Sequence, residues 1–84
     1  MTDIRKIEVE IFGEKHVIRG EGTEEHILEL ARAVDDKMHQ IARRSPRLSL
    51  HQVAILTALN FADDLVKLQE EQEALLQLLD EKTE

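Results

Sequence analysis

The side chains best suited to chemistry are four histidines and two pairs of adjacent aspartates. They are His16, His26, His39 and His51, with Asp35-Asp36 and Asp63-Asp64. No two histidines lie four residues apart, the spacing that places two metal ligands on one face of a helix. Adjacent aspartates on a helix point in different directions and do not converge on a substrate. No phosphate-binding loop, serine-hydrolase or metalloprotease motif occurs. The sequence therefore predicts no enzyme, no metal and no cofactor.

A second set of candidate functional side chains is basic and lies in the middle of the chain. Residues 37–62 carry four basic and no acidic side chains, although the whole chain has a net charge of −7. The four are Lys37, Arg43, Arg44 and Arg47. Two interpretations stay open: the arginines complement the C-terminal dipole of a helix, or they bind carboxylates of a partner. A small DNA-binding dimer is disfavoured, because the net charge repels a phosphate backbone.

These side chains must be positioned by a small fold. Chains of this length bury only roughly 60% of their unfolded surface, so they usually need disulfides, a metal or oligomerisation. There is no cysteine, which makes self-association the leading expectation. No apolar run approaches the roughly 18–20 residues that span a bilayer, and the N-terminus lacks an apolar signal region. We expect a cytoplasmic protein with no membrane insertion and no small-molecule substrate.

Local patterns predict a β-hairpin followed by two helices. Alternation of apolar and charged residues from Ile7 to Ile11 indicates a half-buried strand, and we expect a hairpin over residues 4–20 with its turn near Gly13-Glu14-Lys15. Thr23 suits the N-cap of a helix that ends near residue 44, before Pro46. Ser49-x-x-Gln52 is a capping box, so a second helix is expected from residue 50 to about residue 80.

The predicted second helix carries an apolar stripe in heptad register. Its members are Ala54, Ala58, Phe61, Leu65, Leu68, Gln72, Leu75 and Leu79. Steps of four and three residues along the stripe are typical of a coiled-coil seam. A neighbouring stripe of Ile55, Leu59, Ala62 and Val66 stops at residue 66. We therefore expect an α+β fold, mainly α, with a globular dimerising head over residues 1–66 and a coiled-coil tail over residues 67–84.

Two polar residues interrupt these stripes. Gln72 either specifies the register of an assembly or marks a place where the coil loosens. Asn60 faces solvent, bonds to nearby backbone, or forms a buried amide paired across an interface. Burial without a partner would cost roughly 1–3 kcal/mol, so the third interpretation requires a partner.

Three short segments, in this order and spacing, resemble the ZapA family. They are Ile-Phe-Gly at residues 11–13, Leu-Ala at residues 30–31 and Ala-Leu-Asn at residues 58–60. The resemblance covers about residues 4–80. It implies an intertwined homodimer of hairpin-and-helix heads with paired long helices, no enzymatic activity and no cofactor. It also implies binding to polymers of FtsZ, the division GTPase, and cross-linking or alignment of protofilaments in the mid-cell division ring. The tail ends soon after Leu79, shorter than in some family members, which favours a dimer over a tetramer.

The resemblance assigns partners to the patterns above. FtsZ is expected to be acidic, so the candidate contacts are Lys15, Lys37, Arg43, Arg44 and Arg47. The candidate dimer contacts are Ala54, Ala58, Asn60, Phe61, Leu65, Leu68, Gln72, Leu75 and Leu79. An alternative function from another class is a helical adaptor or chaperone-like module that docks a partner helix in an apolar groove.

Overall fold

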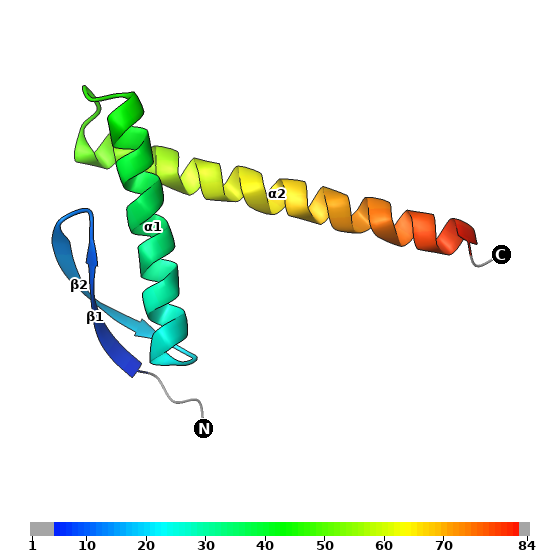
Figure 1. Cartoon of the computed structure of the whole chain (residues 1–84), viewed down its shortest axis with the longest axis horizontal. Coiled ribbons are helices and arrows are strands. Elements are labelled where there is room, and N and C mark those ends of the chain that lie inside the picture. Colours follow the sequence, from blue (N-terminus) through cyan, green and yellow to red (C-terminus); the bar gives the residue numbers. More distant parts are fainter. Residues whose placement is uncertain (1–4, 83–84) are drawn as a thin grey trace.

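The computed structural model describes residues 5–82, which form a β-hairpin and two helices (Figure 1). The elements are β1 (Arg5–Ile11), β2 (Glu14–Gly20), α1 (Glu24–Arg44) and α2 (Leu50–Lys82). The hairpin lies along α1, and α2 crosses α1 near its C-terminal end and then extends away (Figure 1). The predicted α+β, mainly helical fold is confirmed. The predicted start of the hairpin at residue 4 lies outside the described residues, as do residues 83–84 of the predicted tail.

The hairpin turn is one place where the prediction was wrong. Ile11 pairs with Glu14, so the turn consists of Phe12 and Gly13, and Glu14 and Lys15 belong to β2. Both turn residues have positive φ, 52° and 79°, as in the two-residue turns whose twist matches antiparallel strands. Phenylalanine rarely adopts this conformation, so the residue type of Phe12 did not predict the turn.

The hairpin packs one face against α1. Ile7 and Val9 are buried with Ile27, as the alternation in β1 predicts. Ile11, Ile18 and Ala31 are partly buried around them. The opposite face of the hairpin is exposed and mostly charged.

Helix α1 begins and ends as its sequence predicts. The Thr23 Oγ1 accepts a hydrogen bond from the His26 N–H at 3.1 Å, which satisfies one of the unpaired donors of the first turn. At the other end the Ser45 N–H donates to the Ile41 carbonyl at 3.0 Å. The inner face of α1 is apolar: Ile27 and Met38 are buried, and Ala31, Val34 and Ile41 are half-buried.

Helix α2 starts at the predicted capping box. The Ser49 N–H donates to Gln52 Oε1 at 3.0 Å, and the Gln52 N–H donates to Ser49 Oγ at 3.1 Å. Val53 is buried where α2 crosses α1, while most of α2 beyond the crossing has no other element beside it (Figure 1). Within the described residues, neither helix combines the length and apolar character needed to cross a membrane.

Candidate interaction surfaces

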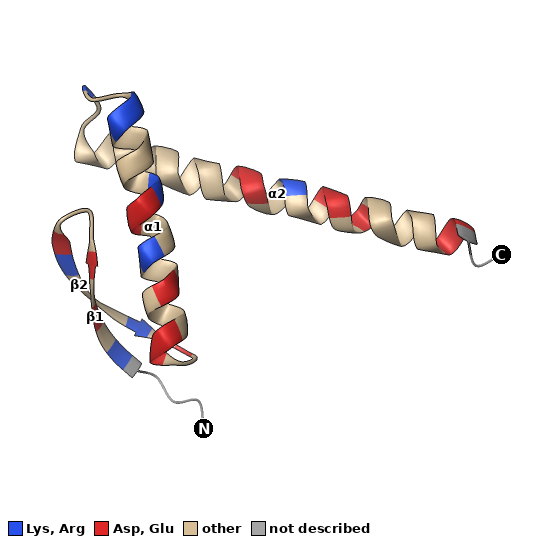
Figure 2. Ribbon diagram, in the orientation of Figure 1, with Lys and Arg blue, Asp and Glu red and all other residues tan. Residues whose placement is uncertain are grey.

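The loop arginines, Arg43, Arg44 and Arg47, form a basic end of the head (Figure 2). They lie at the C-terminus of α1 and in the connection to α2, where the Leu48 N–H donates to the Ser45 carbonyl at 3.2 Å. All three side chains are exposed. Between residues 5 and 82 no acidic side chain pairs with them. The loop therefore presents three guanidinium groups, each able to bind a carboxylate bidentately.

The two lysines predicted to join the arginines are placed differently. Lys37 is half-buried and lies seven residues before Arg44, which puts both on one face of α1. Lys15 lies in β2, and its Nζ is 3.9 Å from Glu8 Oε1 across the hairpin.

The predicted coiled-coil stripe on α2 is uncovered in a single chain. Leu65, Leu68, Leu75 and Leu79 are 57–62% exposed. Ala54, Ala58 and Gln72 are exposed as well, and Phe61 is half-buried. A soluble chain rarely leaves such a continuous apolar strip in water unless it is an interaction site.

The α2 surface that packs on α1 lies beside this stripe. Val53 is 2% exposed and Thr57 is 4% exposed. The Thr57 hydroxyl donates to the Val53 carbonyl at 2.8 Å, so it is buried without an unpaired polar atom. Sequence reasoning missed Thr57 as a core residue because its side chain is polar, although the preceding helical turn supplies its acceptor.

Asn60 forms the local backbone bond in the single chain. Its Nδ2 donates to the Leu56 carbonyl at 2.8 Å, and the side chain is exposed. No described residue donates to its Oδ1. Half of the amide therefore remains available to a partner.

A contact that sequence reasoning missed fixes the hairpin turn to α1. The Phe12 N–H donates to Asp35 Oδ1 at 2.7 Å. The Phe12 and His39 rings are 4.9 Å apart between centroids, and His39 Nδ1 lies 2.8 Å from the Asp35 carbonyl oxygen. The only sequence signal was the spacing of Asp35 and His39, four residues apart on one face of α1.

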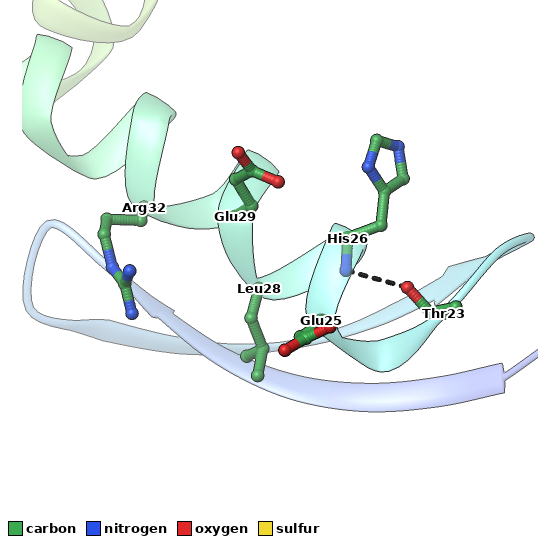
Figure 3. Close-up of a pocket in the computed structure, with 6 residues that line it drawn as sticks. All are labelled: Thr23, Glu25, His26, Leu28, Glu29 and Arg32. Atoms are coloured by element: carbon green, nitrogen blue, oxygen red, sulfur yellow. Dashed lines mark hydrogen bonds between the residues drawn. The ribbon is translucent and has the colours of Figure 1, made fainter.

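A surface hollow lies beside the first turns of α1. One hollow at the start of α1 is lined by Thr23, Glu25, His26, Leu28, Glu29 and Arg32 (Figure 3). Leu28 and Arg32 point toward the hairpin, whereas His26 and Glu29 point away from it (Figure 3). All the lining residues come from one stretch of helix and its cap. Across residues 5–82 no group of three or more potential ligands could hold a metal ion.

Lys67 and Asp63 form an exposed ion pair on α2. The Lys67 Nζ lies 2.9 Å from Asp63 Oδ2, one helical turn earlier. The hydrogen bond and the charge of Asp63 raise the pKa of Lys67, and the charges of Asp64 and Glu70 raise it further.

A family of known proteins matches almost the whole chain. Residues 7–84 match the family described as "Cell division protein ZapA". A relative of that name from Bacillus subtilis (strain 168) is 43% identical, over 98% of this chain and 99% of the relative. Another from Geobacillus sp. (strain WCH70) is 40% identical, over 88% of this chain and 85% of the relative.

A solved structure provides the same result for the fold. It is described as "ZapA mutant dimer from Geobacillus stearothermophilus" and shares 34% sequence identity with this chain. The TM-score is 0.75, with 95% of this chain and 93% of that chain covered. The resemblance drawn from the three short segments is confirmed: the chain belongs to the ZapA family of cell division proteins.

Proposed function

We propose that the chain is a dimeric cell-division protein that binds FtsZ polymers and cross-links or aligns neighbouring protofilaments at the mid-cell ring in the cytoplasm. The observation that carries the proposal is the uncovered apolar stripe of α2 in a chain of the ZapA family. A second copy provides a matching cover, because each stripe can pack into the other as knobs into holes. The similar solved structure from Geobacillus stearothermophilus is a dimer.

The dimer has a head and a tail in this proposal. Residues 1–66 form the head, in which α1 and the first half of α2 pack on the partner. Residues 67–84 form the paired tail. Ten large apolar side chains of α2 are exposed in the described chain, against one that is buried, Val53. Each leucine that is buried fully contributes roughly 1.5–3 kcal/mol, so pairing gives this small head the additional burial that its length requires.

Leu68→Glu tests the dimer. Leu68 is 62% exposed in the single chain, so the substitution leaves the fold of one chain intact but places a carboxylate in the seam. Sedimentation velocity should show a monomer or a dimer weakened at least roughly a hundredfold, as burial of an unpaired charge predicts. Lys67→Glu changes the neighbouring exposed residue and serves as the control that stays dimeric. A Leu68→Glu dimer of wild-type strength contradicts the seam.

The loop arginines are the proposed contact for FtsZ. They are exposed and have no acidic partner among residues 5–82, and arginine clusters recognise acidic partners. The triple variant Arg43→Glu, Arg44→Glu and Arg47→Glu should remain dimeric but lose co-sedimentation with FtsZ polymers.

The matched control reverses three basic residues elsewhere on the head, Lys6, Arg19 and Arg32. They are exposed, and the net charge changes by the same amount. This control should still pellet with FtsZ. Equal pelleting of the loop variant and the wild type contradicts the arginine contact.

A bundling assay, read by light scattering, distinguishes binding to FtsZ polymers from cross-linking of them. A monomeric Leu68→Glu chain retains one set of loop arginines, so it should bind FtsZ polymers weakly without raising light scattering. The wild type should raise it, because two linked heads gain effective concentration for the second polymer.

The uncovered stripe also supports a second candidate, an adaptor that docks a partner helix. The test measures the oligomeric state and the peptide binding of the chain without FtsZ. A monomer that binds an amphipathic peptide through its stripe favours the adaptor. A dimer that does not bind the peptide favours the division-ring function.

A further inference from the structure

The hydroxyl groups of the chain differ in what they bind. Residues 5–82 contain four of them, on Thr23, Ser45, Ser49 and Thr57. The Thr23 and Ser49 oxygens cap the two helices, and the buried Thr57 hydroxyl donates to a carbonyl of its own helix. Within the same range the Ser45 hydroxyl forms no hydrogen bond. Ser45 therefore carries the one hydroxyl of the described residues that the fold does not use.

Ser45 lies where another protein can reach it. It is exposed and directly follows α1, in the connection between the two helices (Figure 1). Its backbone N–H donates to the Ile41 carbonyl at 3.0 Å, and its carbonyl accepts from the Leu48 N–H at 3.2 Å. Both bonds use backbone atoms, so a group attached to the Ser45 Oγ leaves them in place.

Arginines flank Ser45 on both sides. Arg43 and Arg44 precede it, and Arg47 follows after Pro46, at the basic end of the head (Figure 2). All three arginines are exposed, and no acidic side chain between residues 5 and 82 pairs with them. A phosphate on a serine carries about −1.5 to −2 charges and three acceptor oxygens. Arginine binds such a group through forked, charge-assisted hydrogen bonds.

We propose that Ser45 is a phosphorylation site, and that its phosphate switches off the loop arginines as a contact for FtsZ. The modifying enzyme is a serine kinase with an acidic substrate groove, because that groove complements the flanking arginines. Its co-substrate is a nucleoside triphosphate. This regulation rests on the proposed arginine contact with FtsZ, which it reverses.

The transfer is an ordinary phosphoryl transfer. The Ser45 Oγ attacks the γ-phosphorus, and the bond from that phosphorus to the β,γ-bridging oxygen breaks. The nucleoside diphosphate leaves with the electron pair of that bond, and the hydroxyl proton passes to a carboxylate base of the kinase.

The phosphate acts on the charge that an acidic partner needs. Residues 37–62 carry four basic and no acidic side chains, so a phosphate of about −2 halves the net charge of this segment. The phosphate is also attached to the same loop as the arginines, which gives it a high effective concentration there. Carboxylates of FtsZ must compete with it from solution. Binding should therefore weaken at least roughly tenfold.

The experiment is co-sedimentation with FtsZ polymers of the full chain made with phosphoserine at position 45. The affinity should fall at least roughly tenfold, and phosphatase treatment of the same sample should restore it. Sedimentation velocity should show an unchanged dimer. Lys6→Glu is the matched control, since Lys6 is exposed on the hairpin and its reversal changes the net charge from −7 to −9. This control should pellet like the wild type.

The modification itself is tested on the chain isolated from the cells that produce it. Phosphopeptide mass spectrometry should find phosphate on Ser45 in growing or in resting cells. Its absence from Ser45 in both overturns the inference. A phosphoserine chain that pellets like the wild type, or that dissociates into monomers, overturns it as well.

The loop variant (R43E/R44E/R47E) distinguishes this inference from the proposed function. If the loop variant loses FtsZ while the phosphoserine chain keeps it, the arginine contact stands and the switch is refuted. If both chains keep FtsZ, the arginine contact is refuted and the switch with it.

Discussion

Replacing Asp35 by alanine should loosen the hairpin turn from α1. The variant removes the acceptor of the Phe12 N–H, a bond of 2.7 Å to a charged group. Hydrogen bonds to charged groups contribute about 1.5–3 kcal/mol. The Asp35 side chain is 31% exposed, so water replaces part of the lost bond, and we take the lower end, about 1.5 kcal/mol. The variant also removes the contact of 3.4 Å between His39 Nδ1 and Asp35 Oδ1, whereas the Asp35 backbone carbonyl that lies 2.8 Å from His39 Nδ1 is unchanged.

Hydrogen exchange at the Phe12 amide measures this loss directly. A change of 1.4 kcal/mol is a factor of ten in an equilibrium constant. The Phe12 amide should therefore exchange about tenfold faster in the variant. This relation holds when the opened hairpin closes again more rapidly than the amide exchanges. Chain concentration must be equal in all samples, because self-association adds to the apparent stability.

The neighbouring residue provides the matched control. Asp36 is exposed and forms no hydrogen bond or ion pair with residues 5–82, so Asp36→Ala should leave the Phe12 amide unchanged. Asp35→Asn keeps an oxygen acceptor but loses the charge, and should give an intermediate rate. Equal protection of Phe12 in Asp35→Ala and the wild type refutes the reasoning, as does an equal effect of Asp36→Ala.

Three further predictions concern the head and the tail. Val53→Ala removes two methyl groups from a side chain that is 2% exposed. It should lower the free energy of unfolding by about 2 kcal/mol in urea titrations. A loss below about 0.5 kcal/mol contradicts the packing of Val53. Gly20→Ala places a Cβ 3.1 Å from Ile27 Cδ1, so it should cost about 1 kcal/mol or less in the same assay, because a flexible side-chain end can shift. Asp63→Asn removes the largest cause of the raised pKa of Lys67, so an NMR titration should show a lower pKa. The raised pKa means that the ion pair stabilises the helix fully below the unfolded lysine pKa and is lost as pH rises through the folded pKa. An unchanged Lys67 pKa contradicts this assignment.

Local physics explains why most of the fold could be predicted. Alternation in β1, the cap at Thr23 and the capping box at Ser49 are each decided by residues close in sequence. All of them are present in the structure as predicted. Membership of the ZapA family also confirms that the chain is not an enzyme.

Contacts between distant residues could not be predicted in the same way. The Phe12–Asp35 bond joins residues 23 positions apart, and it depends on a turn conformation that the residue type disfavours. The turn was therefore predicted too late in the sequence. A glycine marks a turn but does not say whether it is the first or the second turn residue.

The apolar faces of α2 show a different limit. A periodic pattern tells which residues avoid water, but not whether the cover belongs to the same chain. Val53 and Thr57 pack on α1, while the adjacent stripe from Ala54 to Leu79 stays exposed. The placement of α1 identifies the covered face, which the polar side chain of Thr57 concealed in the sequence.

Asn60 combines local and intermolecular requirements in one side chain. An amide has two N–H donors and one acceptor oxygen, and the Leu56 carbonyl takes one of the donors. The remaining N–H and Oδ1 are the groups that two amides can exchange across a two-fold axis. Burial of both groups unpaired would cost roughly 1–3 kcal/mol each. The local bond and the predicted interface role are therefore compatible. The interface role stays a prediction, and it requires one hydrogen-bond donor and one acceptor from the second chain.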